Sequence, residues 1–235
     1  MYVGMSVGFW LSPTIAAITL IRRGRVFHPG GLYFRGRVER LAQDGAAGEL
    51  AGRLQGAVLV RVSGGTGRVD DKRRDLVGIT LRFHALDGDG SDPADTDQDL
   101  LLATFRSWTS LAKDMGATNT RDLLANDFST VASYLDPDVG RTVFRIPATT
   151  GGSSEGRNGL ERLRHTVTTD GVTLTLQARV DGDWRNLLAI HLEEEGEGDD
   201  KKTRFNPWNA GRGVVPAGFD MGIRRIVYIV GQAVR

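Results

Sequence analysis

The sequence of 235 residues contains no cysteine. This absence excludes disulfide bonds, thiolate metal sites, iron–sulfur clusters and cysteine nucleophiles, and we expect a cytoplasmic location because a reducing compartment suits such a chain. An excess of charge of one sign is also lacking, since 30 basic residues stand against 29 acidic ones and the net charge is +1. Without a broad cationic surface, no nucleic-acid partner is expected.

Long apolar runs are scarce as well. The apolar stretch at 7–20 contains Pro13 and is shorter than the roughly 20 residues that a helix needs to span a bilayer. Arg22 and Arg23 follow this stretch, whereas a secretory signal carries its positive charge in front. We therefore interpret residues 1–24 as an apolar arm or helix that packs on the core or on a neighbouring subunit, and we expect no membrane contact by this arm.

Several site motifs are missing too. No Gly-x-Ser-x-Gly nucleophile elbow occurs. The histidines are scattered at spacings that match no zinc site, so no metal ligands are predicted; they are His28, His84, His165 and His191.

What is present is a pattern of short strands. Apolar and polar residues alternate with a period of two, and β-branched and aromatic side chains are frequent, which indicates strands. The predicted strands cover 31–38, 58–62, 75–84, 97–105, 172–180, 184–192 and 225–234. Two Asp-Gly pairs, at 170–171 and 181–182, are typical of hairpin turns.

Helices are predicted at three places in this series. Residues 38–54 and 108–115 suit short helices, and Asn119 begins a longer amphipathic one. Its apolar residues, spaced by three or four positions until Pro137, are Leu124, Phe128, Val131 and Leu135. Together these elements predict an α+β fold, with an eight-stranded, mostly antiparallel barrel and helices inserted between its two halves.

Particular segments resemble the haem catalases, in the order and approximate spacing of that family. The segment Arg25-Val26-Phe27-His28 resembles the catalase distal-histidine segment. The others that match later strands begin at Val60, Asp75, Asp99, Phe205 and Arg224. The resemblance implies a single catalase-like barrel domain over 25–235, with a linker-like Gly/Ser-rich stretch at 149–159.

The resemblance also implies roles for individual residues. His28 corresponds to the distal acid/base, Ser63 to the serine that orients its imidazole, and Arg25 and Arg61 to arginines that bind haem propionates. The catalase asparagine that binds peroxide falls at or beside Thr104, so a threonine hydroxyl or the methyl of Ala103 stands in its place.

The catalase proximal tyrosine has no match. It lies after the last barrel strand in that family, whereas this sequence ends at Arg235; the tyrosines present are Tyr2, Tyr33, Tyr134 and Tyr228. Since haem iron needs an axial donor, we expect a catalase-related barrel with impaired or absent catalase activity, which binds an apolar small molecule or acts in an assembly as a homo-oligomer. The alternative is a haem-dependent peroxidase or catalase-like oxidoreductase that uses His28, with an axial ligand not identifiable from the sequence.

Simpler interpretations stay open for the same residues. His28 precedes Pro29 and two glycines, so its ring could bond the backbone of a turn. Arg25 and Arg61 could be ordinary strand residues. A hydrolytic dyad of His28 and Ser63 is a further interpretation, although the sequence identifies no orienting carboxylate or oxyanion hole for it.

Overall fold

The computed structural model describes residues 30–65, 74–86, 90–149, 152, 154–196 and 203–218. The predicted arm at 1–24, the pair Arg25 and His28, and the predicted strand at 225–234 lie outside these ranges. Among the helices of the described ranges, none has the length and apolar character that crossing a membrane would require.

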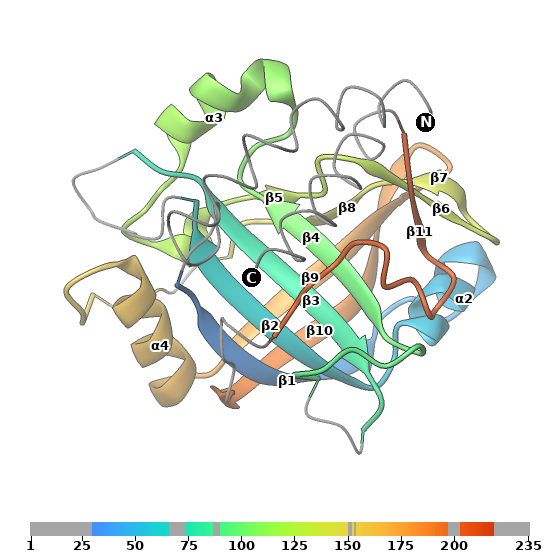
Figure 1. The fold of residues 1–235 in the computed structure, drawn as a ribbon, viewed down its shortest axis with the longest axis horizontal. Helices are drawn as coiled ribbons and strands as arrows, with labels where there is room; N and C mark the ends of the chain where they lie inside the picture. The colour runs from blue at the N-terminus through green and yellow to red at the C-terminus, as the bar shows by residue number, and fades with distance from the viewer. Residues whose placement is uncertain are drawn as a thin grey trace.

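Eight antiparallel strands close into a barrel, which confirms the predicted architecture. The strands β1 to β4 are neighbours on one side, and β5, β8, β9 and β10 complete the circle back to β1 (Figure 1). Their bounds are Leu32–Arg40 (β1), Ala57–Gly64 (β2), Val77–His84 (β3), Gln98–Ala103 (β4), Phe128–Ser129 (β5), Phe144–Ile146 (β8), Val172–Val180 (β9) and Asp183–Glu195 (β10).

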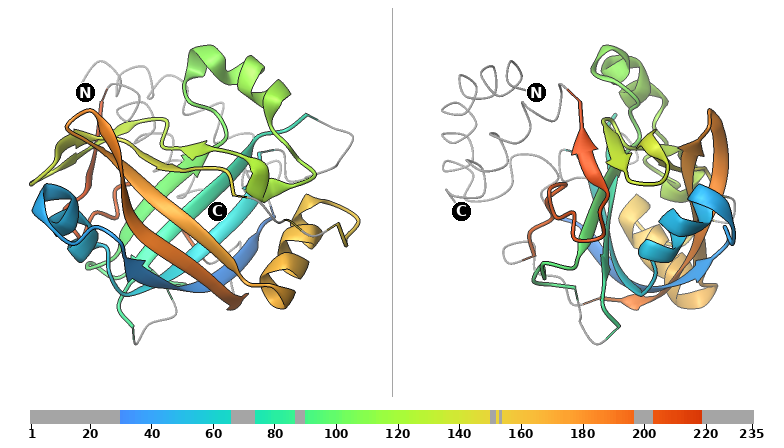
Figure 2. Two further views of the ribbon diagram at one scale, coloured as in Figure 1. Left: turned by 180° about the vertical axis from the view of Figure 1, so that it is seen from behind. Right: turned by 90° about the vertical axis from the view of Figure 1, so that its right-hand side faces the viewer.

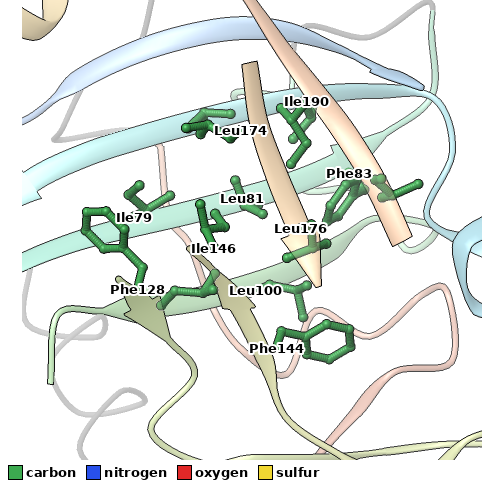
Figure 3. Packing of buried hydrophobic residues seen from close by; sticks show 14 of the residues in the cluster. Ile79, Leu81, Phe83, Leu100, Phe128, Phe144, Ile146, Leu174, Leu176 and Ile190 are labelled. Carbon is green, nitrogen blue, oxygen red and sulfur yellow. The ribbon is translucent and has the colours of Figure 1, made fainter. Parts of the chain in front are cut away.

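Side chains fill the barrel. Alternate residues of each strand point inward, and an eight-stranded barrel is only wide enough to hold its own side chains. Figure 3 shows the inward residues of several strands meeting in one cluster; those labelled are Ile79, Leu81, Phe83, Leu100, Phe128, Phe144, Ile146, Leu174, Leu176 and Ile190. All of them are at most 2% exposed. In the described part of the chain, the barrel interior is therefore a packed core.

Two helices add to this core from different sides. The helix α2 (Gly45–Arg53) contributes Leu50, and α4 (Gly159–Thr169) contributes Leu163 and Val167 to the same apolar cluster. The two helices lie toward opposite ends of the barrel (Figures 1 and 2). The first helix is shorter than the predicted 38–54, because β1 continues to Arg40 before the chain turns.

The connection between the barrel halves carries the 3₁₀ helix η1 (Trp108–Ser110), the helix α3 (Leu111–Ala117) and the 3₁₀ helix η2 (Leu123–Ala125). The first two confirm the short helix predicted at 108–115.

The longer helix predicted from Asn119 is wrong. The chain there forms η2, then β5, then β6 (Ser133–Asp136). Side chains satisfy the backbone in place of a helical ladder: Asn126 Oδ1 accepts from the amide of Asn119, and Asn126 Nδ2 donates to the Asn119 carbonyl, both at 2.8 Å. Phe128 is buried in the barrel, whereas Leu135 is 46% exposed, so the apolar spacing does not form one helical face.

The two Asp-Gly pairs have different structures. Asp181-Gly182 joins β9 to β10 with φ of 52° and 88°, as expected for a type I′ hairpin turn. The hairpin predicted at Asp170-Gly171 is wrong, because Asp170 is the C-cap of α4 and Gly171, with φ of 70°, ends that helix before β9.

A smaller sheet lies beside the barrel. It has the order β11-β6-β7, with β7 at Gly140–Thr142 and β11 at Val215–Ala217. The segment 203–214 leads to β11 across β4, where the backbone of Asp99 donates to the Asn209 carbonyl at 2.9 Å. This segment therefore covers part of the outer face of the barrel.

Candidate functional site

The outward residues of β1 to β4 form the candidate site. In one row across these strands, Tyr33 pairs with Arg61, Arg61 with Thr80, and Thr80 with Leu101. The neighbouring row, which contains Val62 and Ile79, points into the core because successive residues of a strand face opposite sides. Two predicted residues, Arg61 and Ser63, are two positions apart on β2 and so share the outer face.

Arg61 holds the centre of this outer face. Its Nη1 donates to Ser63 Oγ at 2.8 Å, and its Nε donates to the Tyr33 hydroxyl at 3.2 Å. All three residues are 2% exposed. The guanidinium also lies close to Gly31, where an added Cβ would stand 2.9 Å from Arg61 Cζ. The structure thus brings together Arg61 and Ser63, and adds Tyr33 to them.

Aromatic stacking continues from this cluster. The ring of Tyr33 stacks on Phe205, with centroids 6.4 Å apart and planes 20° apart. Arg61 Cζ lies 5.6 Å from the Tyr33 centroid, and Arg82 Cζ lies 4.8 Å from the Phe205 centroid. A cation, two rings and a second cation therefore follow one another along the outer face, and they attach the segment that contains Phe205 to the barrel.

The second cation belongs to a buried ion pair. Arg82 donates to both carboxylate oxygens of Asp99, at 2.8 and 2.9 Å, and both side chains are fully buried. Asp99 also accepts from the amide of Asn206 and from Asn209 Nδ2, each at 2.8 Å. Burial raises the pKa of the Asp99 carboxyl, against the opposite effect of these donors. Sequence reasoning missed this pair, although two charged residues within apolar strands were a visible signal.

Thr104 makes its contacts at the end of β4. Its hydroxyl accepts from the amide of Val77 at 3.1 Å and lies 2.9 Å from the hydroxyl of Thr118, so it ties the end of β4 to β3 and α3. The outward row that contains Ser63 runs through Gly78 to Ala103. A methyl group therefore shares the face with Ser63, and Thr104 has a structural use.

Two of the residues that the resemblance implies for a haem site, Arg61 and Ser63, lie in contact among the described residues. A donor on the iron must lie across the porphyrin from the distal residues, but Tyr33 lies on the same wall as Arg61 and Ser63. Tyr134 belongs to the interior core, packed edge-on against Phe144 with centroids 5.6 Å apart. Within the described ranges, no group of three or more histidine, aspartate or glutamate residues could hold a metal ion. Neither Tyr33 nor Tyr134 is thus placed to serve as the axial donor that haem iron needs.

Comparisons with known proteins agree with the fold. No family model matches the sequence. No curated protein matches it either. Among solved structures, a fungal catalase superposes with a TM-score of 0.55 at 10% identity, over 90% of this chain and 60% of that one. Catalase A from Saccharomyces cerevisiae gives 0.56 at 11% identity, over 93% and 63%. The barrel therefore has the catalase-like fold, and the chain spans about three-fifths of the length of these catalases.

Proposed function

We propose that this chain is a catalase-fold binding protein with impaired or absent catalase activity, and that the outer face of β1 to β4 binds an apolar small molecule. The observation that carries the proposal is the row from Ser63 through Gly78 to Ala103. At this position an amide would hydrogen-bond peroxide, whereas the methyl of Ala103 offers only apolar contact.

The packing of the barrel supports an outer site. Because side chains fill the interior, an apolar ligand has to lie outside the wall. The outward residues there include Leu59, Leu101 and Ala103, with the rings of Tyr33 and Phe205 beside them. All of these except the half-buried Leu101 are buried, and a mainly apolar lining with a few polar groups is typical of small-molecule sites.

One observation favours the alternative, a haem-dependent peroxidase that uses His28. Ser63 Oγ accepts from Arg61 Nη1 at 2.8 Å, which holds on the outer face the hydroxyl that the resemblance implies as the partner of the distal histidine. The binding protein and the peroxidase differ in whether the protein binds haem iron.

The first experiment is an absorbance spectrum of the protein expressed with haem supplied, followed by oxygen release from hydrogen peroxide. We expect no Soret band and no oxygen release above the buffer rate. A near-stoichiometric Soret band that His28→Ala shifts, together with oxygen release that this substitution lowers by about 10²–10⁴-fold, would establish the peroxidase instead.

The second experiment tests ligand binding with a fluorescent apolar probe, 1-anilinonaphthalene-8-sulfonate. We expect Ala103→Trp, on the outer face of β4, to lower the fluorescence of the bound probe. Thr175→Trp, on the outer face of β9, is the matched control and should leave it unchanged. Equal fluorescence from both variants and the unmodified protein would contradict a site beside Ala103.

Assembly as a homo-oligomer has its own supporting observation. Leu135 of β6 pairs with Val215 of β11, and these two apolar side chains are 46% and 47% exposed. Two adjacent, half-exposed apolar side chains lose apolar surface to water when a second copy packs on them. Sedimentation velocity should then show a species larger than the monomer, and Leu135→Glu should return it to the monomer. Identical sedimentation of the two proteins would exclude this surface.

A further inference from the structure

A second group of reactive side chains lies on the outer face of β1, β10 and β9, away from Ser63. His191 of β10 pairs across the sheet with Arg37 on one side and with Thr173 on the other. Its Nδ1 is 2.9 Å from Thr173 Oγ1, and its Nε2 is 3.1 Å from Glu39 Oε2. A hydroxyl, an imidazole and a carboxylate are thus linked in series across three strands.

The carboxylate determines the direction of these hydrogen bonds. An ionised Glu39 can only accept, so the proton of a neutral His191 ring must be on Nε2. The Nδ1 atom then carries a lone pair, and the bond to Thr173 is made by the threonine hydroxyl as donor. The imidazole is therefore oriented as a base toward the proton of Thr173 Oγ1.

An open groove borders His191 and Glu39 of this series. Its lining residues are Arg37, Val38, Glu39 and His191. The side chains of His191 and Glu39 are 40% and 66% exposed, and Thr173 is exposed. Arg37 pairs with Glu193, so a guanidinium and a second carboxylate border the groove. A reagent in solution can reach the threonine hydroxyl without any movement of the barrel.

We propose that Thr173 is an acyl-accepting hydroxyl, with His191 as its general base and Glu39 as the residue that orients the base. The Oγ1 atom attacks the carbonyl carbon of an ester while its proton passes to His191 Nδ1. The new C–O bond forms as the bond to the leaving group breaks, and the leaving group departs with that electron pair. The imidazolium, stabilised by Glu39, then releases the proton to the leaving group or to water.

The chemistry limits the acyl donors to activated ones. The carbonyl oxygen gains charge during the attack, and a donor with a good leaving group needs the least stabilisation of that charge. Aryl esters and thioesters belong to this class, whereas alkyl esters and amides do not. The site goes beyond the proposed binding function and does not depend on it, because Thr173, His191 and Glu39 are not among the residues of the binding site, although both sites use β1.

The test uses p-nitrophenyl acetate with the full chain. We expect release of p-nitrophenolate, a gain of one acetyl group in the intact mass, and an acetylated peptide that maps to Thr173. Thr173→Val, which keeps the shape of the side chain, should abolish that adduct. His191→Gln should slow its formation by about 10²–10⁴-fold, and Glu39→Gln should slow it less, because the imidazole remains.

Thr175→Val is the matched control. Thr175 lies two residues along β9 on the same face and pairs with Ala189, so it has no imidazole across the strand. This variant should be acetylated at Thr173 like the unmodified protein. An adduct at another residue only, or equal acetylation of Thr173 in the His191→Gln variant, would overturn the proposal. A thermal melt of each variant checks that the barrel is intact.

Discussion

The guanidinium of Arg82 and the carboxylate of Asp99 meet at 2.8 and 2.9 Å with both side chains fully buried. Arg82 also donates to the Arg204 carbonyl, and Asp99 accepts from Asn206 and Asn209. The pair therefore joins β3 and β4 to the segment that crosses them. Removal of one partner leaves a buried charge without its counterion.

We predict that Arg82→Met lowers the free energy of unfolding by about 3–5 kcal/mol. Urea denaturation followed by circular dichroism measures the change. Arg37→Met is the matched control, because Arg37 is 75% exposed and its pair with Glu193 contributes at most about 1 kcal/mol. Similar losses in the two variants would show that burial does not set the energy of the Arg82 pair.

Gly31 gives a prediction about close packing. An added Cβ would stand 2.9 Å from both Arg61 Cζ and the Val62 carbonyl oxygen, so Gly31→Ala should displace the guanidinium and cost about 1–3 kcal/mol of unfolding free energy. Gly116→Ala is the control. Gly116 lies within α3, and an added Cβ would stand 3.8 Å from the nearest atom, Arg74 Nη1. Alanine there should be neutral or should stabilise the protein by up to about 1 kcal/mol. Thermal melts compare the two.

Asp114 makes the free energy of unfolding depend on pH in the acidic range. A hydrogen bond from the Ser110 hydroxyl, at 2.6 Å, and then the amide and charge of Arg106 lower the pKa of this carboxyl below its ordinary 3.8. Its contribution is complete above pH 3.8 and is lost as the pH falls through the lower folded value. Asp114→Asn should therefore lose less stability than the unmodified protein between about pH 5 and pH 2. Urea titrations across that range test it, and parallel curves would contradict it.

Asp181 tests the hairpin between β9 and β10. Its φ of 52° lies in the left-handed region, which asparagine tolerates and β-branched residues do not. Asp181→Val should cost about 1–2 kcal/mol, whereas Asp181→Asn should be close to neutral. The midpoints of urea denaturation distinguish the two variants, and a shared midpoint would mean that the turn relaxes to another type.

The strands that sequence reasoning located are the long ones. β9 alternates over nine residues, so its period is visible without any tertiary information. β5 has two residues and β8 has three, which is too short to establish a period. Their place in the barrel depends on pairing with distant strands. The stretch that contains β5 was assigned to a helix because Phe128 and Leu135 happen to fit a helical spacing.

The candidate site was predictable in part for a similar reason. Arg61 and Ser63 are two residues apart on one strand, so a common face follows from the sequence. Their contact with Tyr33 requires the register between β1 and β2, and the stack on Phe205 joins residues far apart in the chain. Whether Ala103 or Thr104 shares the outer face with Ser63 likewise depends on the register between β3 and β4.

The pairing of β1 with β10 has a consequence for synthesis. Arg37 and Glu193, which lie across this seam, are 156 residues apart in the chain. While the ribosome is still adding the second half, β1 can pair only with β2, and its other edge has no partner. A pairing between strands so far apart in the sequence slows folding. Until it forms, the free edge of β1 is exposed and can pair with other chains. We therefore expect the nascent protein to need protection of that edge until β10 emerges. Chaperone supply should change the yield of folded protein in cells, and should leave the free energy of unfolding of the finished protein unchanged.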